Sequence, residues 1–90
     1  MNYTNNQALA DLKAIFAQLE AILVDAAEKG EPSADHECAV IEAAILYGEI
    51  EDAIEQVSND KVMLSRHMQN YIALNVYEST RVIADYRELA

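Results

Sequence analysis

Residues 6–33, which read NQALADLKAIFAQLEAILVDAAEKGEPS, contain one complete helical segment and the signal that ends it. Apolar side chains recur there at steps of three and four residues, the spacing that puts them on one face of an α-helix. Gly30 then supplies a left-handed cap, and Pro32 cannot continue a helix. We therefore predict a helix over residues 6–29. Its apolar seam comprises Leu9, Leu12, Phe16, Leu19, Leu23 and Ala26, which Ile15 and Ile22 widen.

The same periodicity returns in residues 34–57, where we predict a second helix. Ser33 is a favourable N-cap residue, and Asp35 and Glu37 place negative charge at the positive end of the helix dipole. The predicted seam comprises Ala39, Ala43, Leu46, Ile50, Ala53 and Val57, with Tyr47 and Ile54 beside it.

A third helix is predicted over residues 61–88. Residues 58–60, Ser-Asn-Asp, interrupt the preceding pattern, and each of them can cap a new helix. A kinked continuation of the second helix is the alternative. The predicted seam comprises Leu64, Met68, Tyr71, Asn75, Val82, Tyr86 and Leu89, with Ile72 and Ile83 at its margin.

The chain is expected to form one helical domain over residues 1–90. Two Gly and one Pro leave little material for turns, which favours few and long elements. Short connections make sequential helices pack antiparallel, so we predict an all-α, up-down-up, antiparallel three-helix bundle. A chain of this size buries only about 60–65% of its unfolded surface, and pairing into a homodimer is a possible supplement.

The location of the protein is predicted from what the sequence lacks. The N-terminal residues show no basic region followed by an apolar stretch, as a signal peptide requires. No apolar run approaches the roughly 20 residues that span a bilayer. The lone Cys38 cannot form an internal disulfide, which fits a reducing compartment. We expect a cytoplasmic protein.

Negative charge is concentrated in the middle of the chain. The formal net charge is −10, and residues 31–60 contain nine acidic residues and no Lys or Arg. Such a surface attracts a protein partner with a basic surface. It disfavours direct binding to nucleic acid, which needs cations against the phosphates, and it disfavours anionic membranes for the same reason.

A second apolar side on the predicted second helix is the main indication of function. Ile41 and Ile45 lie nearly opposite its seam on a helical wheel, so the core does not account for them. They predict either an intermolecular contact or cover by residues 1–6 or the chain end. Acidic residues ring the pair, as at an interaction site, although they also aid solubility. The predicted partner-binding set is Ile41, Ile45, Glu37, Glu42, Glu49, Glu51, Asp52 and Glu55.

The first predicted helix has a weaker second stripe of small residues. Ala14, Ala17, Ala21 and Val24 lie away from the Leu seam. Alanine on a solvent face is also a good helix former without any other role, so this stripe has two interpretations.

The sequence gives no indication of an enzyme, and we predict no metal or other cofactor. Residues 35–38, Asp-His-Glu-Cys, offer several potential metal ligands, but consecutive residues fan out around a helix and cannot converge on one ion. Cys38 has no activating base beside it in the sequence. Phosphate-binding loops and other catalytic motifs are not found.

In size, charge and helical content the chain is similar in type to bacterial secretion chaperones, toxin-immunity proteins and phage-encoded inhibitors of host defence. This resemblance rests on no motif, and it implies a protein that binds a partner and holds or blocks it. Two alternatives remain: a nucleic-acid mimic that occupies the basic groove of a nucleic-acid-binding protein, and a self-assembling structural unit.

Overall fold

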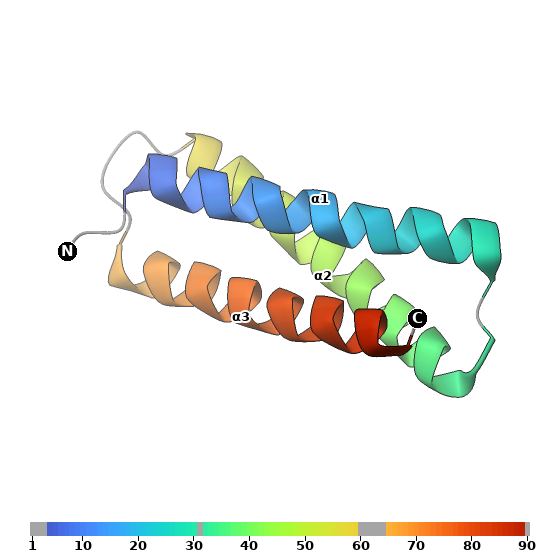
Figure 1. The fold of residues 1–90 in the computed structure, drawn as a ribbon. Coiled ribbons are helices and arrows are strands. Elements are labelled where there is room, and N and C mark those ends of the chain that lie inside the picture. The colour runs from blue at the N-terminus through green and yellow to red at the C-terminus, as the bar shows by residue number, and fades with distance from the viewer. Residues whose placement is uncertain (1–3, 31, 60–64, 90) are drawn as a thin grey trace.

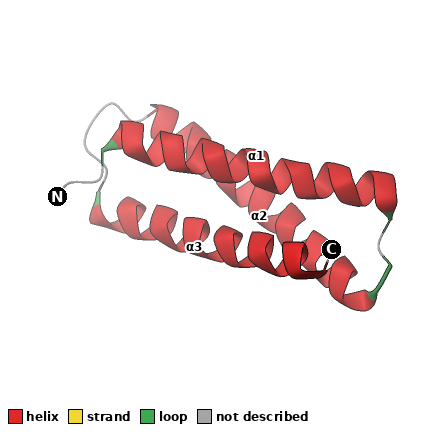
Figure 2. Ribbon diagram, in the orientation of Figure 1, coloured by secondary structure: helices red, strands yellow, loops and turns green. Residues whose placement is uncertain are grey.

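The protein is all-helical, with three helices that pack against one another (Figures 1 and 2). The computed structural model describes residues 4–30, 32–59 and 65–89, in which no strand occurs. The helices are α1 (Asn5–Lys29), α2 (Ala34–Asn59) and α3 (Arg66–Leu89). In Figure 1, α1 and α3 run in the same direction and α2 runs in the opposite direction. The up-down-up course of the helices is therefore as predicted.

The start of α1 is fixed by a capping box that was not predicted from the sequence. The Oγ1 atom of Thr4 accepts a hydrogen bond from the Gln7 backbone N–H at 3.2 Å, and Gln7 Oε1 accepts one from the Thr4 N–H at 2.9 Å. These bonds satisfy two donors that a helix start otherwise leaves unpaired. The Thr-x-x-Gln spacing was the available signal, and it places the first helical residue at Asn5 instead of Asn6.

The end of α1 at Lys29 and the start of α2 at Ala34 lie where they were predicted, but the predicted left-handed cap at Gly30 is wrong. Gly30 has a φ of 80° and donates its N–H to the Ala26 carbonyl at 2.8 Å. Its ψ of −174° puts it outside the left-handed helical region, in a conformation that is almost restricted to glycine. Ser33 caps α2, since its Oγ accepts the His36 N–H at 3.2 Å.

Gly30→Ala is expected to lower the free energy of unfolding by about 1–3 kcal/mol, because alanine is strained at this φ and ψ. The matched control is Gly48→Ala in the middle of α2, where a Cβ meets nothing within 4 Å. That substitution should raise stability by about 0.5–1 kcal/mol. Urea unfolding followed by circular dichroism measures both, and a neutral Gly30→Ala would contradict the cap assignment.

The predicted start of α3 is wrong. Ser58 and Asn59 belong to α2, and the residue that caps α3 is Ser65, whose Oγ accepts the Met68 N–H at 3.1 Å. Ser65 is itself non-helical, so the helix begins at Arg66. The remaining predicted positions, residues 61–64, lie outside the described residues. The alternative of one kinked helix is also wrong, because α2 and α3 run in opposite directions (Figure 1).

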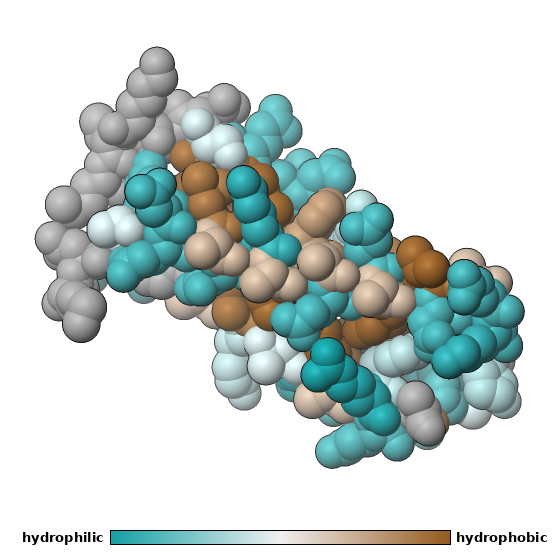
Figure 3. Space-filling view, turned by 45° about the horizontal axis from the view of Figure 1, so that its top comes forward, coloured by the Kyte–Doolittle hydropathy of each residue, from teal (hydrophilic) through white to brown (hydrophobic). Residues whose placement is uncertain are grey.

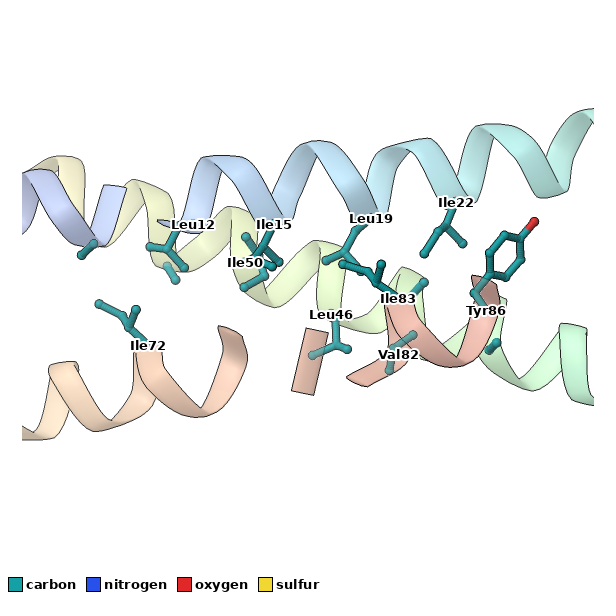
Figure 4. Packing of buried hydrophobic residues seen from close by; sticks show 14 of the residues in the cluster. Leu12, Ile15, Leu19, Ile22, Leu46, Ile50, Ile72, Val82, Ile83 and Tyr86 are labelled. Carbon is teal, nitrogen blue, oxygen red and sulfur yellow. The ribbon is translucent and has the colours of Figure 1, made fainter. Parts of the chain in front are cut away.

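The core lies between the three helices (Figure 4). All six residues of the predicted α2 seam are buried, and Tyr47 and Ile54 pack against the core from the side. The buried faces of α1 and α3 are rotated from the predicted seams. Fully or nearly buried are Ile15, Ile22, Ile72 and Ile83, which were predicted at the seam edges. Only partly buried are Leu9, Phe16, Leu23, Met68, Tyr71 and Leu89.

Two polar residues of α3 lie in this core. Asn75 is 5% exposed, and its Nδ2 donates to the Tyr71 carbonyl one turn earlier at 3.0 Å. Its amide is therefore bonded within α3. Ser79 is fully buried, and its Oγ has no hydrogen-bond partner in the described part of the chain.

Ser79→Ala is expected to raise the free energy of unfolding by about 1 kcal/mol, because it removes a buried hydroxyl without a partner and improves helix propensity. Thr80→Ala is the control: its hydroxyl is exposed and donates to the Val76 carbonyl at 2.8 Å. The control should change stability by less than about 0.5 kcal/mol. A loss of stability in Ser79→Ala, measured by urea unfolding, would mean that the hydroxyl is bonded in solution.

Candidate interaction surface

The candidate surface is the side of α2 that faces away from the core, hereafter the outer face of α2. Because the buried residues of α2 follow one helical stripe, the residues half a turn away from it point outward. Ile41 is 52% exposed and Ile45 is 58% exposed. Two β-branched side chains one turn apart thus lie on the surface of this helix.

The terminal segments that could cover these isoleucines are only partly described. Of residues 1–6, Thr4 caps α1 and the next two residues form its first turn, beside the other end of α2 (Figure 1). The end of α3, at Leu89, does not cover Ile41 and Ile45, since both remain exposed. Residues 1–3 and 90 lie outside the described residues.

Five of the six predicted acidic residues form no ion pair within the described part of the chain. Glu37, Glu49, Glu51, Asp52 and Glu55 are exposed, and none forms an ion pair with another described residue. Four of them follow the isoleucines along α2, in the C-terminal half of the helix. The outer face of α2 therefore changes from apolar to acidic along its length.

Glu42, the sixth predicted acidic residue, is part of an ion-pair network between α2 and α3. Its Oε2 lies 3.5 Å from Arg81 Nη2, and Arg81 also contacts Glu78 at 3.0 Å and Asp85 at 3.3 Å. The pKa of Arg81 is raised above its usual value, mainly by the hydrogen bond to the Glu78 carboxylate. Glu42 thus links α2 to α3 at the side of α2 that is next to α3. The groove beside it, about 460 Å³, is lined by Asp35, Cys38, Ala39, Glu42, Arg81, Asp85, Glu88 and Leu89.

Two polar contacts fix the end of the bundle where α2 begins. The Leu89 carbonyl can only accept, so His36 Nε2 donates to it at 2.9 Å, while His36 Nδ1 lies 2.6 Å from the Ser33 hydroxyl. On the other side, the Tyr86 hydroxyl donates to Asp25 Oδ2 at 2.6 Å. These bonds join α2 to α3 and α3 to α1, which indicates a structural role for His36.

Asp25 also pairs with Lys29 at 2.9 Å. The pKa of Asp25 lies below its usual 3.8. The hydrogen bond from Lys29 lowers it most, and the hydrogen bond from Tyr86 is the second cause. Because this pKa is lowered in the folded state, the ionised Asp25 carboxylate stabilises the fold above pH 3.8. Its contribution to the free energy of unfolding is lost as the pH falls through the lowered pKa.

Further exposed apolar side chains lie on α1 and α3. Figure 3 turns the top of the Figure 1 view toward the viewer and shows apolar areas between hydrophilic side chains on this face. Val24 is 51% exposed at the end of the predicted stripe of small residues. Leu74 and Tyr77 of α3, 60% and 67% exposed, were not singled out from the sequence. Both lie outside the predicted α3 seam, and this position could have indicated from the sequence that they are exposed.

No other kind of site is evident in residues 4–30, 32–59 and 65–89. Within these ranges, no three His, Cys, Asp or Glu residues are grouped to hold a metal ion. Cys38 is exposed and free. No helix of the described chain has the length and apolar character to cross a membrane. Comparisons with protein families, curated proteins and solved structures found no match.

Proposed function

We propose that this protein binds a protein partner through the outer face of α2 and acts by holding or blocking that partner. The observation that supports this most is the exposure of Ile41 and Ile45 on a helix whose opposite side is fully packed. A partner that covers both side chains gains on the order of 2 kcal/mol from their burial. This gain is modest, so the proposed interface needs further contacts.

The acidic residues supply the second part of the proposed interface. Glu49, Glu51, Asp52 and Glu55 have no cation beside them among the described residues. Carboxylates around an apolar centre accelerate encounter with a basic partner and fix its orientation. The proposed role is therefore that of an inhibitor, immunity protein or chaperone with a basic partner, and it requires no catalytic group and no cofactor.

Nucleic-acid mimicry is the alternative, and it is favoured by the carboxylates in the second half of α2, which pair with no cation among the described residues. The isoleucines weigh against it, because they interrupt the carboxylate array that would replace a row of phosphates. Salt distinguishes the two. Binding by a mimic should collapse between low and moderate ionic strength, whereas binding through an apolar centre should weaken only modestly.

Glu51→Gln combined with Asp52→Asn is expected to slow association with the partner and to flatten its salt dependence, while dissociation changes little. The physical reason is that exposed charges steer encounter but add little to the bound state. Surface plasmon resonance with a captured partner at several salt concentrations measures both rates. Glu20→Gln combined with Glu28→Gln on α1 removes the same charge elsewhere, and an equal effect of this control would exclude local steering by α2.

The test of the proposed function is partner capture that depends on the outer face of α2. The bait is the full chain, compared with an Ile41→Asp and Ile45→Asp double variant and with Val24→Asp, which puts a charge at a similarly exposed position of α1. We expect the wild type and Val24→Asp to capture a partner that the double variant does not capture. The same partner, once purified, should bind the wild type directly. Solution mass at several concentrations shows whether the chain pairs with itself. Equal capture by all three baits would overturn the proposal.

A further inference from the structure

The exposed residues of α2 form two consecutive holes of the kind that receives a side chain from a packed helix. Such a hole is made by four residues at positions i, i+3, i+4 and i+7. Ile41, Ala44, Ile45 and Gly48 make the first hole, and all four are exposed. The second hole lies one heptad later and shares Gly48; its other members are Glu51, Asp52 and Glu55, which are exposed as well.

Gly48, at the junction of the two holes, has no explanation in the described fold. It lies inside α2, where its φ is not in the positive range that favours glycine, and a Cβ added to it would meet nothing within 4 Å. Glycine is a poor helix former, so alanine would suit this position better in the isolated chain. A glycine does allow the backbone of a second helix to approach closely.

We infer that the partner presents a basic amphipathic helix that packs lengthwise along α2 and approaches it most closely at Gly48. This inference rests on the proposed function. An apolar side chain of the partner helix enters the first hole, and an Arg or Lys seven residues away enters the second. Residues 41–55 span about 21 Å, so the partner helix needs about four turns to fill both holes.

A second copy of this chain does not fit the same face. Antiparallel pairing of two α2 helices about Gly48 sets Ile41 of one copy against Glu55 of the other, and Ile45 against Glu51. Parallel pairing sets carboxylates against carboxylates, which is destabilising without cations between them. Charge complementarity therefore selects a basic helix of another protein.

Synthetic helical peptides of about 22 residues, long enough to be helical alone, provide the probe. One peptide has an Ala-rich background with Leu and Arg seven residues apart on one seam, in either order. The controls replace Arg by Glu or rotate Leu and Arg onto opposite faces. Fluorescence anisotropy measures binding, and amide chemical shifts of the protein locate it. We expect saturable binding of the seam peptide to α2 in at least one order, and at least about tenfold weaker binding of both controls.

Gly48→Ala gives the sharpest test, because it should stabilise the fold and yet weaken peptide binding about tenfold by filling the contact point. Asn70→Ala is the matched control, since it also improves helix propensity at an exposed position, on α3, and should leave binding unchanged. Unchanged binding in Gly48→Ala, or equal binding of seam and rotated peptides, overturns the helix inference. The proposed function fails separately, if partner capture survives the Ile41→Asp and Ile45→Asp double variant.

Discussion

Leu19→Ala and Ile50→Ala are each expected to lower the free energy of unfolding by about 2–5 kcal/mol. Both side chains are fully buried, one from α1 and one from α2, and both belong to the cluster shared by the three helices (Figure 4). Truncation removes their apolar contacts and leaves a cavity that the neighbouring helices only partly fill. Domains of this size are stabilised by only about 5–15 kcal/mol, so either variant should shift the unfolding transition strongly.

Urea unfolding followed by circular dichroism gives the size of this loss. Val24→Ala is the control, because Val24 is half exposed on α1 and its truncation should cost less than about 0.5 kcal/mol. Losses below about 1 kcal/mol at both Leu19 and Ile50 would mean that these residues do not share a packed core.

Ile41→Asp and Ile45→Asp are expected to abolish partner binding while the chain stays folded. Each side chain is more than half exposed, so the free energy of unfolding should change by less than about 1 kcal/mol. In a complex, the new carboxylate lies in a desolvated centre next to existing carboxylates, which costs about 3–5 kcal/mol. That cost corresponds to a loss of affinity of about 100-fold or more.

Thermal unfolding and a binding titration with the purified partner measure the two effects separately. Val24→Asp adds the same charge to α1 and should leave affinity within about twofold. An unfolded Ile41→Asp variant would show that this side chain supports the core. Full binding by both folded variants would place the interface elsewhere, with the exposed Leu74 and Tyr77 of α3 as the next positions to test.

Much of the fold follows from local features of the sequence. The three- and four-residue spacing predicts the helices, because it puts apolar side chains on one face of each. Gly30 and Ser33 end α1 and begin α2 as their own backbone and side-chain chemistry requires. The outer face of α2 is predictable too, since a position opposite a buried seam points outward in any packing of that helix. Its isoleucines and its surplus of carboxylates were therefore visible before the structure.

Other features depend on how the helices pack. Ser58, Asn59 and Ser65 can all cap a helix, and only the folded chain selects Ser65 as the cap of α3. The wheel of one helix does not show where its two neighbours lie, which is why Ile15 and Ile83 prove more buried than expected. Contacts between distant residues are likewise set by the packing: Glu42 with Arg81, His36 with the Leu89 carbonyl, and Tyr86 with Asp25. Periodicity fixes each face relative to its own helix axis, whereas the rotation of one helix against another is a property of the assembled core.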